Sequence, residues 1–179
     1  MIPLSHPPLL VNGAVYDLAH LTGFSAAFAG KGKVAGTDLE ISVRFSNHVV
    51  TKRAAHGQAF HAVDQHGTKR CFDLPRYDMS LQLPQAICDL ITANGLSYVS
   101  QSYGGVKNLI SLRAADSKVW AIVFCFYPDL NGLSVQMHIL SAHLKVVDPR
   151  NIVRKNLSYF ARECLFAQQR IPKQRPSRS

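Results

Sequence analysis

The sequence lacks a hydrophobic run long enough to cross a membrane. Its longest uninterrupted apolar stretch covers the nine residues 119–127, whereas a membrane-spanning helix needs about 20. The N-terminus has no basic segment ahead of its early prolines, which argues against a secretory signal. We therefore expect a cytoplasmic protein with no membrane partner.

Cysteines are few and scattered, at positions Cys71, Cys88, Cys125 and Cys164. None of them forms a C-x-x-C pair, so we predict free, buried thiols in a reducing compartment.

The common motifs of hydrolytic metal sites and of nucleotide sites are also missing. The eleven acidic residues include no D-x-D, E-x-x-H or H-E-x-x-H motif, and there is no P-loop, Rossmann or G-x-S-x-G pattern. His56, His61 and His66 recur every five residues, which is neither a strand nor a helix period, so they are not expected to share a face. We predict no metal and no other cofactor.

Positive charge is abundant but unevenly placed. The net charge is +9, and residues 150–179 hold eight basic residues and one acid, a net +7. Such a segment attracts polyanions by screened, sequence-independent attraction. RNA, and in second place DNA, is therefore the expected partner, and a solvated tail that aids solubility is the alternative.

The expected centre of the fold is a β-hairpin over residues 119–145. Val119–Tyr127 is rich in β-branched and aromatic residues, which favours a buried strand, and the turn ends at Gly132. In the second strand the alternation slips by one residue at Leu140, which predicts a β-bulge.

The other elements predict an α+β fold with an antiparallel, mostly meandering sheet. We expect hairpins at Asn12-Gly13 and over residues 58–72, and a long alternating strand over 38–51. Apolar spacing predicts one helix near 81–93 and a C-terminal helix over 151–168. Residues 1–168 form one globular domain, and residues 169–179 are a basic, disordered tail.

The candidate active site is one face of the strand over 38–51, where Arg44, Ser46 and His48 alternate. A histidine near neutral pKa takes a 2′-hydroxyl proton, and an arginine stabilises the charge that develops on phosphorus. His143 or His138, from the hairpin, supplies the acid. The expected phosphate-binding residues are Ser46, Arg76, Tyr77, Ser141, Lys145, Arg154 and Lys155. The alternative for each histidine is a half-buried sheet residue bonded to its neighbours.

Two segments carry a resemblance to a family. Phe45-Ser46-Asn47-His48-Val49-Val50-Thr51 resembles the F-S-x-H-x-x-T strand of a bacterial and prophage-type family of unknown function. That family's second pattern is matched by Arg70-Cys71-Phe72-Asp73-Leu74-Pro75-Arg76-Tyr77, Ser80 and Leu83-Pro84, and its final Ser-Ala by Ser141-Ala142. Asp73 stands where relatives tend to carry cysteine, which removes support for a cysteine-based mechanism.

The order of elements is also similar, more distantly, to the small ribonuclease toxins of the barnase, colicin and RelE type. That similarity implies a metal-independent endoribonuclease acting on RNA, with an antitoxin or another protein as its partner. Two alternatives stay open. One is a non-catalytic nucleic-acid-binding or prophage regulatory protein that uses its basic C-terminus. The other is a protein–protein module of the inhibitor or immunity kind.

Overall fold

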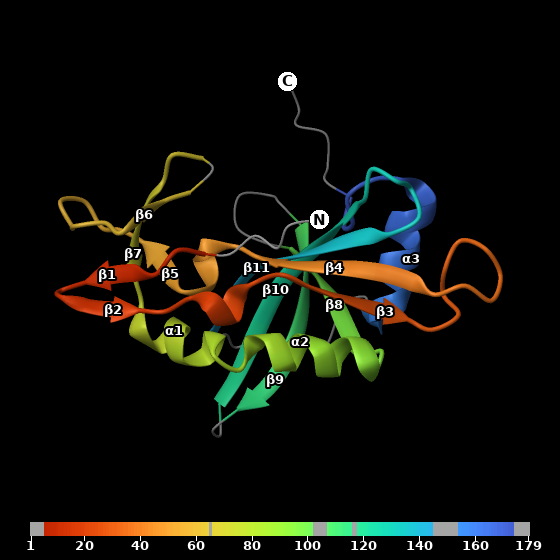
Figure 1. Ribbon diagram of the computed structural model, residues 1–179, viewed down its shortest axis with the longest axis horizontal. Coiled ribbons are helices and arrows are strands. Elements are labelled where there is room, and N and C mark those ends of the chain that lie inside the picture. Colours follow the sequence, from red (N-terminus) through yellow and green to blue (C-terminus); the bar gives the residue numbers. More distant parts are fainter. Residues whose placement is uncertain (1–5, 65, 102–106, 116–117, 145–153, 174–179) are drawn as a thin grey trace.

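The fold is built on one seven-stranded sheet, in the order β12-β8-β9-β10-β11-β4-β3 (Figure 1). The computed structural model describes residues 6–64, 66–101, 107–115, 118–144 and 154–173. The strands of this sheet are β3 (Phe24–Phe28), β4 (Leu39–Phe45), β8 (Leu96–Gln101), β9 (Lys107–Ala115), β10 (Lys118–Pro128), β11 (Val135–Leu144) and β12 (Arg154–Asn156).

The sheet confirms the α+β prediction and its meander, with one correction. Strands β8 to β11 pair antiparallel in sequence order, but β11 pairs β4 in parallel. The two strands are far apart in the sequence, and their alternation patterns do not encode relative direction. The sheet is therefore mixed rather than purely antiparallel.

The β10–β11 hairpin contains the predicted bulge. Ser141 pairs with Val123 and Ile139 pairs with Phe124, so Leu140 is left without a partner on β10. Val135, Met137, Ile139 and Ala142 are all fully buried, as the shifted alternation requires.

Two smaller sheets complete the strand set of the described residues. The hairpin of β1 (Leu9–Val11) and β2 (Ala14–Tyr16) turns at Asn12-Gly13, where both residues have positive φ, as predicted. The three-stranded sheet has the order β5-β7-β6, with β5 (Thr51–Arg53), β6 (Ala62–Val63) and β7 (Lys69–Phe72). In Figure 1 it lies at one end of the molecule, away from β3 and α3.

The described residues include three α-helices, which pack on the main sheet. The predicted helix is α2 (Leu83–Thr92), with Pro84 in its first turn, and it is preceded by α1 (Leu74–Ser80), a separate helix that the apolar spacing did not predict. Asp73 caps α1 by accepting a hydrogen bond from the backbone N–H of Arg76 at 3.3 Å. Helix α3 (Leu157–Ala167) is shorter than predicted, because residues 154–156 form β12 and pair with β8.

The helices and the sheet share one continuous hydrophobic core. Helix α1 packs on β11, α2 on β3, and α3 on β10, β11 and β12. The core includes Phe124 and Phe126 from β10 and Leu83 and Ile87 from α2, each fully buried. Among the described residues, no helix is long and apolar enough to cross a membrane.

The long strand predicted over residues 38–51 is wrong beyond Phe45. Ser46 accepts a hydrogen bond from the backbone N–H of His48 and caps the 3₁₀ helix η2 (Asn47–Val49). Thr51 then donates to the carbonyl of Asn47 at 2.8 Å. These local bonds compete with the sheet ladder, so the chain turns out of the main sheet and enters β5.

The segment predicted as a tail begins within the fold. Ile171 is 1% exposed and exchanges two backbone hydrogen bonds of 2.9 Å with Phe126. Arg170 donates to the side chain of Asn108 and to the hydroxyl of Tyr127. Residues 174–179 lie outside the described residues.

Candidate active site

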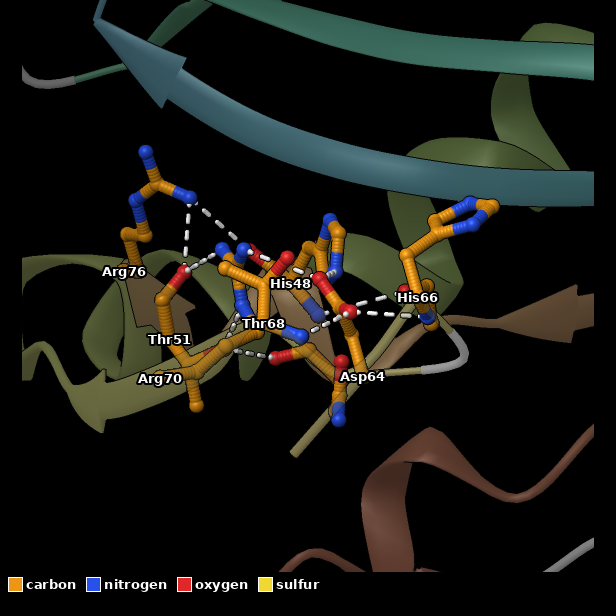
Figure 2. A network of polar contacts seen from close by, with 9 residues as sticks. His48, Thr51, Asp64, His66, Thr68, Arg70 and Arg76 are labelled. Carbon is orange, nitrogen blue, oxygen red and sulfur yellow. Dashed lines mark hydrogen bonds and ion pairs between the residues drawn. The ribbon is translucent and has the colours of Figure 1, made fainter. Parts of the chain in front are cut away.

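A histidine–carboxylate pair joins η2 to the turn between β6 and β7 (Figure 2). His48 Nε2 donates to Asp64 Oδ2 at 3.1 Å. Because a carboxylate only accepts, Nε2 carries a proton, and in the neutral ring Nδ1 then keeps its lone pair. Figure 2 shows the ring turned so that Nδ1 points away from Asp64. The pair therefore presents a neutral imidazole with a basic nitrogen on its outer side.

Asp64 is held from both oxygens. Its Oδ1 accepts the backbone N–H groups of His66 and Thr68, each at 2.9 Å. Its Oδ2 also faces the guanidinium of Arg70 at 3.6 Å. The Asp64 side chain is only 6% exposed and that of Arg70 9%, so the position of the carboxylate is tightly fixed.

Arg70 and Arg76 tie this network to β5. Arg70 donates to Thr51 Oγ1 at 2.8 Å and to the Thr51 carbonyl at 3.0 Å. Arg76 Nη1 donates to the carbonyls of His48 at 2.9 Å and Thr51 at 2.8 Å. The guanidinium groups of Arg70, on β7, and Arg76, on α1, thus lie close enough to His48 for their charge to act on it.

The electrostatics favour a neutral His48. Burial first, and then the charge of Arg70, hold the pKa of His48 below its usual value, although Asp64 pulls it upward. Burial alone raises the pKa of Asp64, but the N–H groups of Thr68 and His66 and the nearby His48 outweigh it and leave that pKa lowered. At neutral pH the site therefore combines an ionised carboxylate with an unprotonated imidazole.

The structure brings together some of the residues predicted for the site and separates others. His48, Arg76 and Ser46 are joined by the contacts above. Arg44 stays on β4, directly beside His138 in the register with β11. The predicted common face of Arg44 and His48 is therefore wrong, because the strand ends between them.

His138 belongs to a second polar cluster on the main sheet. Its Nε2 hydrogen-bonds Gln136 Oε1 at 3.2 Å, and its ring lies 4.9 Å from that of Tyr127. Burial, followed by the charge of Arg44, lowers the pKa of His138. Gln136 donates in turn to Asp129 at 3.1 Å. Arg44 and His138 thus form a pair of their own, apart from the His48 network.

The remaining predicted residues lie in several places. His143 contacts Ser141 through a hydrogen bond of 3.3 Å on β11. The hydroxyl of Tyr77 donates to the Asp17 carbonyl at 3.3 Å. Arg154 and Lys155 are exposed on β12, and Lys145 lies outside the described residues.

Asp64, Arg70 and Thr51 were missed as site residues. Asp64 stands alone in the sequence, and its pairing with His48 depends on how the β6–β7 turn folds back. One signal was available, since Thr51 and Arg70 both belong to the two segments that carried the family resemblance. The structure shows that these two segments meet, through the bonds from Arg70 and Arg76 to Thr51.

No group of three or more metal-binding side chains occurs within the described ranges. His61, one of the three evenly spaced histidines, accepts a hydrogen bond from the backbone N–H of Phe72 at 3.2 Å. His66 belongs to the turn that holds Asp64. The four cysteines are free thiols, three of them buried.

The chain matches the family model described as the YjaZ family over residues 8–165. The match covers most of the chain, so the chain belongs to this family, whose description names no activity. The predicted relation to a bacterial family of unknown function is confirmed at that level. No curated protein and no solved structure matches the chain. The similarity to the ribonuclease toxins stays a prediction.

Proposed function

We propose that this YjaZ-family protein is a metal-independent endoribonuclease with His48 as its general base. The observation that carries the proposal is the His48–Asp64 pair beside two arginines. A carboxylate that fixes an imidazole tautomer is the arrangement by which enzymes orient a histidine base. The two arginines provide the fixed positive charge that a phosphoryl-transfer reaction requires.

The reaction follows from the tautomer. Nδ1 of His48 takes the proton of a ribose 2′-hydroxyl, and the 2′-oxygen bonds to the adjacent phosphorus. The bond from phosphorus to the 5′-oxygen breaks, and an acid returns a proton to that oxygen. The products are a 2′,3′-cyclic phosphate and a free 5′-hydroxyl, and His48 ends as an imidazolium next to the Asp64 carboxylate.

Arg76 is the residue best placed to bind the phosphate. Both of its hydrogen bonds use Nη1, and its Nε and Nη2 donate to no other group in the part of the chain that the structure describes. A guanidinium anchored at one nitrogen keeps its remaining donors for a phosphate oxygen. Arg70 is more enclosed, so its role is to hold Asp64 and Thr51.

The acid in this scheme is His66. Figure 2 shows the rings of His66 and His48 projecting on the same side of Asp64. His66 is exposed, and histidine is the side chain that most often transfers a proton in general acid–base catalysis. His143 and His138, predicted as the acid from the sequence, stay as alternatives for the same step.

The test is cleavage of a doubly labelled RNA by purified protein in EDTA. His48→Ala should lower the rate by about 10²–10⁴-fold, the usual contribution of a general base. His20→Gln is the matched control, because His20 bonds Ser80 at 2.8 Å and glutamine retains a donor there. Absence of cleavage by the wild type, or an unchanged rate in His48→Ala, would refute the proposal.

The acid is identified from pH–rate profiles. Replacing the acid by glutamine removes the fall in rate on the alkaline side, since that limb reports loss of its proton. His66→Gln should have this effect, and His138→Gln and His143→Gln should keep the wild-type limb. The opposite pattern would return the role to the hairpin histidines.

A second candidate function is non-catalytic nucleic-acid binding. The observation that favours it is a set of exposed aromatic rings beside cations on the solvent-facing side of α3. Tyr159 and Phe166 are each about half exposed, at 51% and 52%. Lys155 lies 5.5 Å from the ring centre of Tyr159, and Arg162 lies 5.4 Å from that of Phe166. Aromatic rings beside cations suit stacked bases and phosphates. RNA retention without cleavage, lost in Arg162→Glu, would favour this alternative.

A further inference from the structure

A large open cavity lies beside the His48 network, between the loops of the three-stranded sheet. Its volume is about 1040 Å³. The chain leaving β5 at residues 53–60 forms one part of its lining, and residues 66–69 form the other. His66 and Thr68 belong to this lining and also hold Asp64 through their backbone N–H groups. The cavity therefore begins where the proposed catalytic network ends.

The cavity is cationic. Its lining includes Arg53, Lys69, His56 and His66, and among the described residues no carboxylate belongs to it. Arg53 and Lys69 lie on neighbouring strands, since the backbone N–H of Ala54 donates to the Lys69 carbonyl at 2.9 Å. Neither forms a salt bridge with any residue that the structure describes. Two exposed cations without a counter-ion attract an anion.

The lining also offers an aromatic surface. Phe60 is 46% exposed, and the ammonium of Lys69 lies 4.9 Å from the centre of its ring. An exposed phenyl ring in a polar loop provides little stability from burial. It does provide a face on which any base can stack. The neighbouring ammonium is then available to the phosphate of the same nucleotide.

We infer that this cavity binds a single-stranded segment of nucleic acid, with phosphates at Arg53 and Lys69 and a base on Phe60. The inference deepens the proposed function and rests on it, because the segment would continue from the nucleotides held at His48. The volume is far larger than one phosphate requires, which favours a chain of nucleotides. The pairing of cations with an aromatic ring favours a nucleic acid over an acidic peptide.

Binding is measured by fluorescence anisotropy with a single-stranded 2′-O-methyl oligonucleotide, which cannot be cleaved through its 2′-oxygen. The double variant Arg53→Gln/Lys69→Gln should weaken binding and flatten its salt dependence, by about 0.7 in log–log slope for each phosphate contact. The matched control is Lys31→Gln/Lys33→Gln, which removes the same charge from the exposed β3–β4 turn. In Figure 1 that turn lies at the opposite end of the molecule.

The aromatic contact is tested separately. Phe60→Ala should weaken binding by about fivefold or more, the usual effect of losing one stacked base. It should have no effect on an abasic oligonucleotide of the same length. Because Phe60 is exposed, the variant should unfold at the wild-type temperature.

The outcomes separate this inference from the proposed function. Equal losses in the two double variants, or a polyglutamate peptide that competes as well as the oligonucleotide, would overturn the inference. Loss of binding confined to Arg53→Gln/Lys69→Gln would support it, whether or not the wild type cleaves RNA. Cleavage that depends on His48 but not on Arg53, Lys69 or Phe60 would leave the proposed function standing and remove the binding site.

Discussion

Replacing Asp64 by asparagine changes the charge of the His48 network and keeps its shape. In Asp64→Asn the amide oxygen takes the place of Oδ1, so it can still accept the N–H groups of His66 and Thr68. What disappears is the negative charge that faces His48 at 3.1 Å and Arg70 at 3.6 Å. The acceptor for the Nε2–H of His48 disappears with it, because the amide nitrogen that replaces Oδ2 is a donor. Two positively charged arginines then remain beside the imidazole.

The size of the effect follows from these distances. An opposite charge within a few ångströms moves a pKa by about 1–3. The His48 side chain is 30% exposed, so solvent screens part of that interaction, and we expect Asp64→Asn to lower the pKa of His48 further. Arg70 is nearly buried, and breaking a buried pair costs about 3–5 kcal/mol. Since Arg70 keeps its two bonds to Thr51, we expect the lower end of that range.

The pH dependence of stability has a defined sign. The folded-state pKa of His48 is lowered, so the folded protein binds fewer protons than the unfolded chain, and stability falls as pH drops below about 6.5. The lowered pKa of Asp64 adds stability above about 3.9, which is lost at lower pH. Asp64→Asn should remove the loss of stability that comes from protonation of Asp64. It should also extend the loss that comes from protonation of His48 to lower pH.

The assays are an NMR titration of the His48 imidazole and urea unfolding at pH 7 and pH 5. The control is Asp129→Asn, which should leave the His48 titration unchanged. The carboxylate of Asp129 accepts hydrogen bonds from Ser134, in the β10–β11 turn, and from Gln136 on β11. A rise in the His48 pKa in Asp64→Asn, or a stability loss below about 1 kcal/mol where a buried pair should cost more, would show that Asp64 is not a charged partner of this network.

Three further predictions concern the frame around the site. Ile171→Ala should cost about 2–4 kcal/mol in urea unfolding, because Ile171 is buried and paired with Phe126; an unchanged midpoint would contradict that burial. Thr51→Val should cost about 1–3 kcal/mol, since it leaves Arg70 Nε without its acceptor; an unchanged midpoint would contradict that bond. Burial raises the pKa of Cys164 to about 12, so mass spectrometry should find this thiol unmodified by iodoacetamide in mildly alkaline buffer until the protein unfolds.

The core of the fold could be predicted because its signals are local. Alternation on β4 and β11 identified their buried faces, and the one-residue slip located the bulge at Leu140. The Asn12-Gly13 turn and the apolar stripe of α2 are equally local. Each depends on neighbours within a few residues, so the sequence alone is enough to predict it.

The end of β4 could not be predicted from alternation. Arg44, Ser46 and His48 continue the polar pattern of the strand, yet the hydroxyl of Ser46 caps η2 instead. Over a few residues, the sequence pattern around a serine in a strand is the same as that around a serine that caps a turn. The choice is made by contacts far along the chain, because Arg76 binds the carbonyls of His48 and Thr51.

The members of the His48 network differ in exposure, and this difference distinguishes residues that stabilise the fold from a residue that could act in catalysis. The side chains of Asp64 and Arg70 are almost buried. A purely structural role, in stabilising the fold, would be enough to explain either of them. His48 is the more exposed member, and its imidazole is held through the bond from Nε2 to Asp64. Glutamine can donate that bond but cannot act as a base near neutral pH. His48→Gln should therefore retain the unfolding midpoint of the wild type and lose RNA cleavage. A histidine with a purely structural role would give the reverse, a lower midpoint in His48→Gln with cleavage by the folded variant unchanged.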